Sequence, residues 1–155
     1  MIRSFKDILE SALGREPRRV VVPFPAADDI RTLSRAAGSG LVVPCLVGDA
    51  GLLKKAVDRT PPMSPVFEIA HAAGRKEALW QAVSRVREGR ADILMQGGLS
   101  PRALMKTVLD PVRGLKSKGG TPGYISLFPL PKQDKLILIT DTFLNDFPTL
   151  VEKQG

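Results

Sequence analysis

One short stretch of the chain combines residue types that could bind an anion. Gln96 offers a side-chain amide, Ser100 offers a hydroxyl, and two adjacent glycines would let a ligand approach the backbone closely. Ser100 followed by proline is also typical of a helix start, where unpaired N–H groups attract phosphate. The predicted anion-binding residues are Gln96, Gly97, Gly98 and Ser100. The alternative is that the glycines only shape the turn, since the stretch matches neither a Walker A loop nor a dinucleotide fingerprint.

This stretch needs a strand before it and a helix after it to be positioned as a site. Asp92 to Met95 is a short apolar run that predicts a buried strand. Apolar residues then recur at helical spacing, at Ala103, Leu104 and Val108. In an open α/β sheet, ligands bind at the carboxyl ends of the strands, where such a turn lies.

Strands and helices alternate through the preceding part of the chain. The predicted strands are Arg19 to Phe24, Leu41 to Val47 and Val66 to His71. The predicted helices carry Phe5 to Leu13, a segment capped by Asp28 or Asp29, a segment starting at Gly48-Asp49, and Ala78 to Val86. The valine-rich first strand indicates burial on both faces. This alternation predicts a three-layer α/β/α sandwich with a mostly parallel sheet.

The pattern changes after Leu109. A basic, glycine-rich loop runs from Asp110 to Gly123, and two apolar runs at 124–130 and 135–140 predict a C-terminal antiparallel hairpin. Asn145 and Asp146, ahead of Pro148, predict the start of a further helix.

Composition narrows the classes of partner. The 155 residues predict a single α/β domain over 1–155, and a net charge of +7 favours anionic partners. Nucleic acid is not favoured, because no basic run is interleaved with aromatic residues, and no apolar run reaches membrane-spanning length. The N-terminal segment lacks the features of a signal peptide. The single cysteine, Cys45, is predicted to be a packed thiol, which fits a reducing cytoplasm.

Five segments, in order, resemble one enzyme family. They are RRVVVPFPAADD, VVPCLVGD, FEIAH, the run ending VREGRADILMQGG, and LILITDTFLNDFPTL. Together they resemble the first half of the phosphate acetyltransferase and phosphate butyryltransferase family, whose fold is similar to that of isocitrate dehydrogenase. The resemblance therefore implies an isocitrate dehydrogenase-like half.

The resemblance also implies an activity, the exchange of acyl-CoA and phosphate for acyl phosphate and CoA. Coenzyme A would be a substrate or product, and no tightly bound cofactor is expected. The family's cleft lies between two domains, so a second domain or a partner chain would be needed, and the chain could form a homo-oligomer. The alternative is a non-catalytic half-length homologue that binds CoA or phosphorylated small molecules, or acts as an assembly module.

The chain departs from the family pattern at several places. Gln96 stands where members commonly have lysine, Ser100 where a histidine follows, and Lys116 where they have a basic-loop arginine. Gly123-Tyr124 replaces a Ser-His pair. Gln96 keeps hydrogen bonding but loses a positive charge, and Lys116 keeps charge but loses bidentate geometry.

Further candidates each have a structural alternative. Lys116 and Lys118, with Arg113, could attract CoA phosphates or be solvated loop residues. Asp141 and Asn145 follow a strand, where they could bind a substrate or cap the closing helix. Neither a catalytic residue nor a metal ligand is assigned.

The lone His71 has no second ligand at metal-site spacing. Trp80 falls beside the apolar stripe of its predicted helix, where it could cover the core edge or a partner surface.

Overall fold

The computed structural model describes residues 2–60, 67–116, 122–130 and 132–140. Contacts divide the chain into two compact units, residues 13–115 and a smaller unit made of residues 1–12 and 116–155. Each unit is described by itself. The predicted single domain is not decided by this division and stays a prediction. The predicted closing helix at Asn145 lies outside the described residues.

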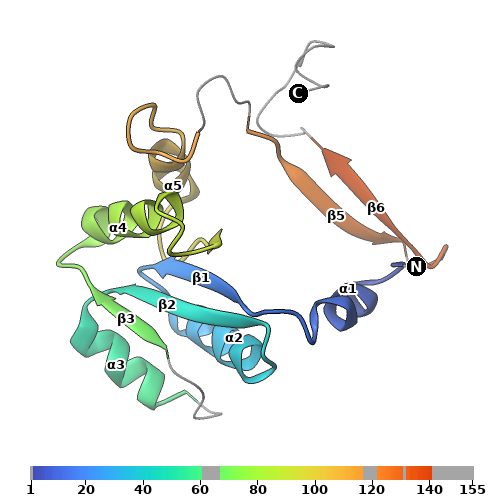
Figure 1. Cartoon of the computed structure of the whole chain (residues 1–155), viewed down its shortest axis with the longest axis horizontal. Helices are drawn as coiled ribbons and strands as arrows, with labels where there is room; N and C mark the ends of the chain where they lie inside the picture. Colours follow the sequence, from blue (N-terminus) through green and yellow to red (C-terminus); the bar gives the residue numbers. More distant parts are fainter. Residues whose placement is uncertain (1, 61–66, 117–121, 131, 141–155) are drawn as a thin grey trace. The chain divides into compact units, whose positions relative to one another are not determined.

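The larger unit alternates strands and helices as predicted (Figure 1). Its strands are β1 (Arg18–Pro23), β2 (Val42–Gly48), β3 (Glu68–His71) and β4 (Ile93–Leu94). Its helices are α2 (Ala27–Gly38), α3 (Ala50–Asp58), α4 (Arg75–Arg87) and α5 (Pro101–Val108). All strand pairs are parallel, in the order β3-β2-β1-β4. The predicted α/β class with a mostly parallel sheet is confirmed.

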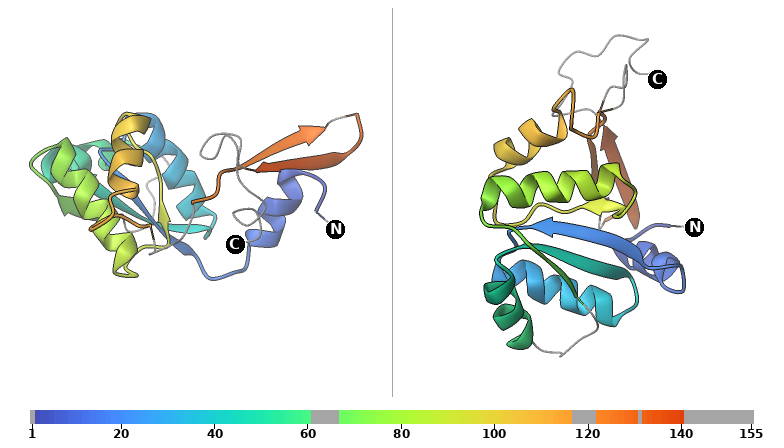
Figure 2. Two further views of the ribbon diagram at one scale, coloured as in Figure 1. Left: turned by 90° about the horizontal axis from the view of Figure 1, so that it is seen from above. Right: turned by 60° about the vertical axis from the view of Figure 1, so that its left-hand side comes forward.

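Alternating side chains of β1 and β2 form a core on each face of the sheet. Val20, Val22 and Leu46 pack with residues of α2 and α3. Val21, Cys45 and Val47 pack on the other face, where α4 supplies alanines. Helices therefore cover both faces, as Figure 2 shows. The near-continuous apolar run of β1 follows from this burial on two sides.

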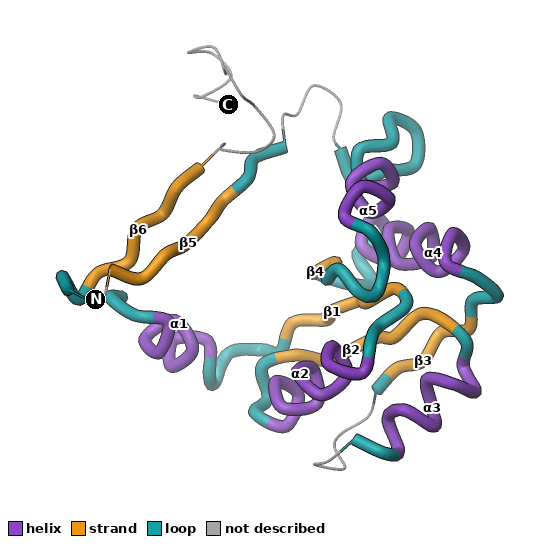
Figure 3. The backbone as a smooth tube through the Cα atoms, turned by 180° about the vertical axis from the view of Figure 1, so that it is seen from behind, coloured by secondary structure: helices purple, strands orange, loops and turns teal. Residues whose placement is uncertain are grey.

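A third apolar cluster joins α4 to α5. Leu79 and Val83 of α4 are buried with Leu99, and Ala103 and Leu104 of α5 pack against them. α5 consequently lies beside α4, and the turn after β4 leads into it (Figure 3). This helix pair forms the outer wall on one face of the sheet.

Two local predictions for the larger unit were wrong in detail. The N-cap of α2 is Ala26, not an aspartate, and Asp29 instead accepts a hydrogen bond from the Ala26 N–H at 2.7 Å. β4 has only two residues, although Asp92 beside it also contacts β1: its N–H donates to the Arg19 carbonyl at 2.8 Å, and its carboxylate accepts the Arg19 N–H at 2.8 Å. Met95 still donates its N–H to the carbonyl of Val21 at 3.0 Å.

The smaller unit contains α1 (Phe5–Ala12), β5 (Ile125–Leu130) and β6 (Lys135–Thr140). The predicted antiparallel hairpin is confirmed, with Phe128 paired to Ile137. α1 begins where Ser4 and Asp7 exchange hydrogen bonds, which is a typical capping arrangement. No residue of α1 is buried, so its apolar face is formed but not covered within the described residues.

Candidate active site

The carboxyl ends of β1 and β4 meet where the order of the strands reverses. The chain runs from β1 outward to β2 and β3, then returns to place β4 on the other side of β1. Such a switch point is the expected ligand site of an open α/β sheet. Phe24 directly follows β1 there and has a φ of 52°, a backbone region that bulky residues rarely adopt. Its carbonyl accepts the Gly98 N–H at 2.7 Å.

Both predicted glycines pack tightly against the end of β1. A Cβ atom at Gly97 would overlap the carbonyl oxygen of Pro23 and lie 3.1 Å from Val22 Cγ1. A Cβ atom at Gly98 would lie 2.9 Å from the carbonyl oxygen of Phe24. The glycines therefore have a structural role in bringing two strand ends together, which favours the turn-shaping alternative. Phosphate binding by this turn stays a prediction.

The two predicted polar side chains of this turn have internal partners. Gln96 Nε2 donates to the carbonyl of Leu99 at 3.0 Å, which braces the turn. Ser100 Oγ accepts the Ala103 N–H at 3.2 Å, so Ser100 caps α5 as predicted. This bond uses an oxygen lone pair, and the hydroxyl hydrogen can still be donated to a ligand.

A cavity of about 450 Å³ lies between α4 and α5 and includes Ser100 in its wall. This volume falls within the range of about 300–1,000 Å³ that is typical of small-molecule sites. The lining residues are Arg75, Lys76, Leu79, Trp80, Leu99, Ser100, Ala103, Lys106, Thr107 and Asp110. Of the predicted anion-binding residues, Ser100 lines the cavity, whereas Gln96, Gly97 and Gly98 do not.

Three cations line this cavity. Arg75 and Lys76 occupy the first turn of α4, and Lys106 lies in the last turn of α5. The Arg75 guanidinium lies over the Phe24 ring, with 5.3 Å from Cζ to the ring centroid. Positive charge at a helix start opposes the helix dipole, so this placement costs some stability, which Glu77 in the same turn offsets in part. A bound anion would offset that cost.

The one carboxylate in the wall has a structural role. Asp110 Oδ1 accepts the N–H groups of Arg113 at 2.8 Å and Val112 at 3.0 Å. These bonds, that of Arg113 first, hold the pKa of Asp110 below its ordinary value. Asp110 therefore stays ionised and fixes the turn after α5, and it only partly balances the three cations.

The cavity also has apolar lining residues. Leu79 and Leu99 are buried, and Trp80 and Ala103 also line the cavity. A lining that includes both cations and apolar groups fits a ligand with an anionic head and a short apolar part. Within the described ranges, no group of three or more His, Cys, Asp or Glu residues is placed to hold a metal ion.

Arg113 and His71, which the sequence also singled out, do not line this cavity. Lys116 is exposed and belongs to the smaller unit. Lys118, Asp141 and Asn145 lie outside the described residues. His71 ends β3, where its Nδ1 accepts the Ala50 N–H at 3.4 Å.

Sequence reasoning missed the cations of the cavity. Arg75, Lys76 and Lys106 come from two helices that meet only after packing, so no local motif contains all three. One signal was available: a basic pair at the start of a helix is unfavourable there and so suggests a ligand.

No helix among the described residues is long and apolar enough to cross a membrane.

Comparison with known proteins confirms the predicted resemblance. The chain is 29% identical over 154 residues to a phosphate butyryltransferase of Clostridium acetobutylicum, an alignment that covers 99% of this chain and 51% of that protein. It is 30% identical over 149 residues to a probable phosphate butyryltransferase of Bacillus subtilis, covering 95% and 48%. A phosphate acetyltransferase of Rhizobium meliloti is 26% identical over 151 residues, covering 97% and 48%.

The chain spans about half the length of the curated relatives it matches. No family model matches it.

Proposed function

We propose that this chain provides one half of a phosphate acyltransferase, which converts an acyl-CoA and phosphate into an acyl phosphate and CoA. The other half would come from a second domain or a partner chain, with a second copy of this chain as one candidate. Coenzyme A is then a substrate or product, with no tightly bound cofactor. The free, buried thiol of Cys45 is consistent with a protein located in a reducing cytoplasm.

The cavity between α4 and α5 is the observation that carries this proposal. Its three cations, Arg75, Lys76 and Lys106, suit a phosphate dianion, and its apolar lining residues suit a short acyl chain. Two relatives that align with nearly all of this chain are named phosphate butyryltransferase and phosphate acetyltransferase, and these names contain the same two groups, phosphate and a short acyl chain. The two lines of support are independent, because the cations were identified from geometry alone.

The chemistry asks little of the chain beyond positioning and charge. A phosphate oxygen forms a bond to the thioester carbonyl carbon, the C–S bond breaks, and CoA leaves as a thiolate that takes up a proton. In the proposal, Lys106 and the α4 cations hold the phosphate, and the Ser100 hydroxyl donates a hydrogen bond to a ligand oxygen. The developing oxyanion needs further donors, which the second half would supply. No covalent enzyme intermediate is required.

The first test measures binding by the chain alone. Replacing Lys106 with glutamine should weaken inorganic phosphate binding about tenfold or more, since one charge-assisted hydrogen bond is lost. Lys55→Gln is a matched control, because Lys55 is likewise a basic, exposed residue in the last turn of a helix, α3. Titration calorimetry of both variants decides the point. Equal weakening in both variants would remove this cavity from consideration as the phosphate site.

The second test measures catalysis. Phosphate-dependent release of CoA from acetyl-CoA and butyryl-CoA is assayed with the chain alone. It is then assayed after mixing the chain with the part of the Clostridium acetobutylicum protein that this chain does not match. That part alone is the control. We expect release in the mixture, and sedimentation velocity shows which assembly is active. No release in either preparation would contradict a catalytic role.

A non-catalytic, ligand-binding homologue is the second candidate. It is favoured by one observation: Gln96, which stands where the family commonly has lysine, donates to Leu99 instead of presenting a charge. In that case phosphate or CoA binds at the cavity, Lys106→Gln weakens it, and no CoA is released with any second half.

A further inference from the structure

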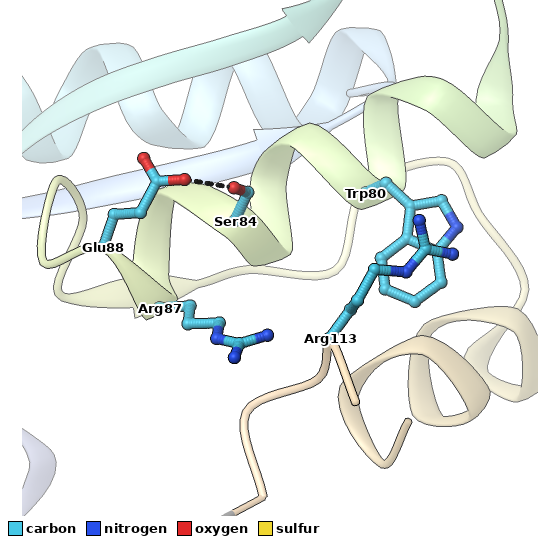
Figure 4. A pocket seen from close by; sticks show the side chains of 5 residues that line it. All are labelled: Trp80, Ser84, Arg87, Glu88 and Arg113. Atoms are coloured by element: carbon cyan, nitrogen blue, oxygen red, sulfur yellow. Dashed lines mark hydrogen bonds between the residues drawn. The ribbon is translucent and has the colours of Figure 1, made fainter. Parts of the chain in front are cut away.

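We propose that a second cavity, which shares the Trp80 side chain with the candidate active site, binds the phosphate group of a small phosphomonoester. This cavity has a volume of about 410 Å³ and is lined by Trp80, Ser84, Arg87, Glu88 and Arg113 (Figure 4). α4 supplies one side of it, and the turn after α5 supplies Arg113. The proposal does not depend on the proposed function.

Two guanidinium groups give the cavity its positive character. Arg87 Nη1 donates to the carbonyl of Val112 at 2.7 Å, which fixes the side chain and leaves its other N–H groups available to bind an anion. Arg113 lies over the Trp80 ring, with 4.1 Å from Cζ to the ring centroid. Stacking uses the face of the guanidinium and leaves the donors at its edge for hydrogen bonding.

The carboxylate in the wall does not neutralise these arginines directly. Glu88 accepts a short hydrogen bond from the Ser84 hydroxyl, and its other oxygen is paired with Arg90, which lies 2.6 Å away. Figure 4 shows the Ser84–Glu88 bond along α4, away from the Trp80–Arg113 stack. Glu88 is therefore engaged by neighbours on its own segment. The ionised Asp110 carboxylate, which interacts electrostatically with Arg113 and Arg87, offsets part of their positive charge, and the rest is available to a ligand.

The size and composition of the cavity favour an organic phosphate. Arginine pairs bind tetrahedral phosphate oxygens through paired N–H donors, and a fixed, stacked guanidinium loses little freedom when it does so. The volume exceeds what a bare phosphate would fill, and the indole of Trp80 offers apolar contact to an attached organic group. A nucleoside monophosphate combines both parts.

AMP is the probe, and the fluorescence of the chain's single tryptophan, Trp80, reports its binding. Titrations are made in the wild type and in Lys106→Gln, which weakens the α4–α5 cavity. We expect AMP to bind both proteins with similar affinity. Adding Arg87→Gln or Arg113→Gln should reduce the affinity about 10- to 100-fold, the loss of one charge-assisted contact. Arg113→Lys, which keeps charge but loses stacking, should fall between.

The ligand's chemistry is tested by competition. Inorganic phosphate should displace AMP, and adenosine should not. Circular dichroism and thermal melting confirm that each variant folds, and Arg113→Lys gives a second route if Arg87→Gln disturbs the turn at Val112. The proposal is overturned if AMP does not bind, if adenosine competes as well as phosphate, or if Lys106→Gln abolishes binding while the arginine variants retain it.

Discussion

Replacing Gly97 with alanine should loosen β4 from β1. Gly97 does not have a left-handed backbone, so the effect tests close packing and not backbone strain. The new methyl group would overlap the Pro23 carbonyl oxygen and press on Val22 Cγ1 and the Phe24 carbonyl oxygen, each 3.1 Å away. Backbone carbonyls in a parallel sheet cannot turn aside as a flexible side chain can, so the strand end must move.

The expected cost follows from the contacts. Overpacking of a tight interior commonly costs about 1–3 kcal/mol, and the overlap with backbone places Gly97→Ala at or above about 3 kcal/mol. Gly89→Ala is the matched control: Gly89 has a φ of 70° and open space around its Cβ position, so only backbone strain of about 1–2 kcal/mol is expected.

Urea unfolding monitored by far-ultraviolet circular dichroism measures both variants. With a slope of about 1–3 kcal/mol per molar, Gly97→Ala should lower the midpoint by at least about 1 M, more than Gly89→Ala does. A Gly97→Ala protein that is as stable as the wild type but no longer binds phosphate would refute the packing argument. It would mean that the glycine admits a ligand and does not serve the sheet.

Two further predictions concern Asp92 and Cys45, two residues of the larger unit whose pKa values depart from their ordinary values. Arg19 holds the pKa of Asp92 at about 2, below its ordinary 3.8, so this carboxylate contributes stability above about pH 4 that is lost as the pH falls through about 2. Asp92→Asn should therefore be less stable than wild type in urea at neutral pH, with Asp58→Asn as the control. The difference in stability between Asp92→Asn and wild type should almost disappear near pH 2. A difference of unchanged size at that pH would contradict the prediction. Burial raises the pKa of the Cys45 thiol to about 11, so a thiol reagent at pH 8 should label it far more slowly in the native protein than in denaturant, and equal rates would count against its burial.

Most of the fold was predictable because the spacing of apolar residues and the residues that begin or end helices and strands indicate the same elements along the chain. The valines of β1 alternate between two cores, which a near-continuous apolar run predicts for a covered parallel sheet. The hairpin followed in the same way from two apolar runs. Boundaries were less predictable, because the ends of a strand depend on bonds to residues far away in sequence: β4 is limited to Ile93–Leu94, although Asp92 and Met95 also donate backbone N–H groups to β1.

The candidate site was only partly predictable for a related reason. Ser100 was found because a cap, a proline and the helix it starts lie together in sequence. Lys106 and the basic pair of α4 meet through the packing of Leu79 and Leu99 between two helices, and no local pattern encodes that meeting. The glycines could not be assigned from sequence either, since close strand packing and close ligand approach both require a missing side chain.

The indole of Trp80 lines both cavities, so the two proposed sites share one side chain. A ligand that shifts the ring, or the Arg113 guanidinium stacked on it, in one cavity alters the wall of the other. Thermodynamic linkage makes any such coupling reciprocal: whatever factor AMP imposes on phosphate affinity, phosphate imposes on AMP affinity. A single aromatic side chain would then be enough for heterotropic control between two sites on adjacent helices.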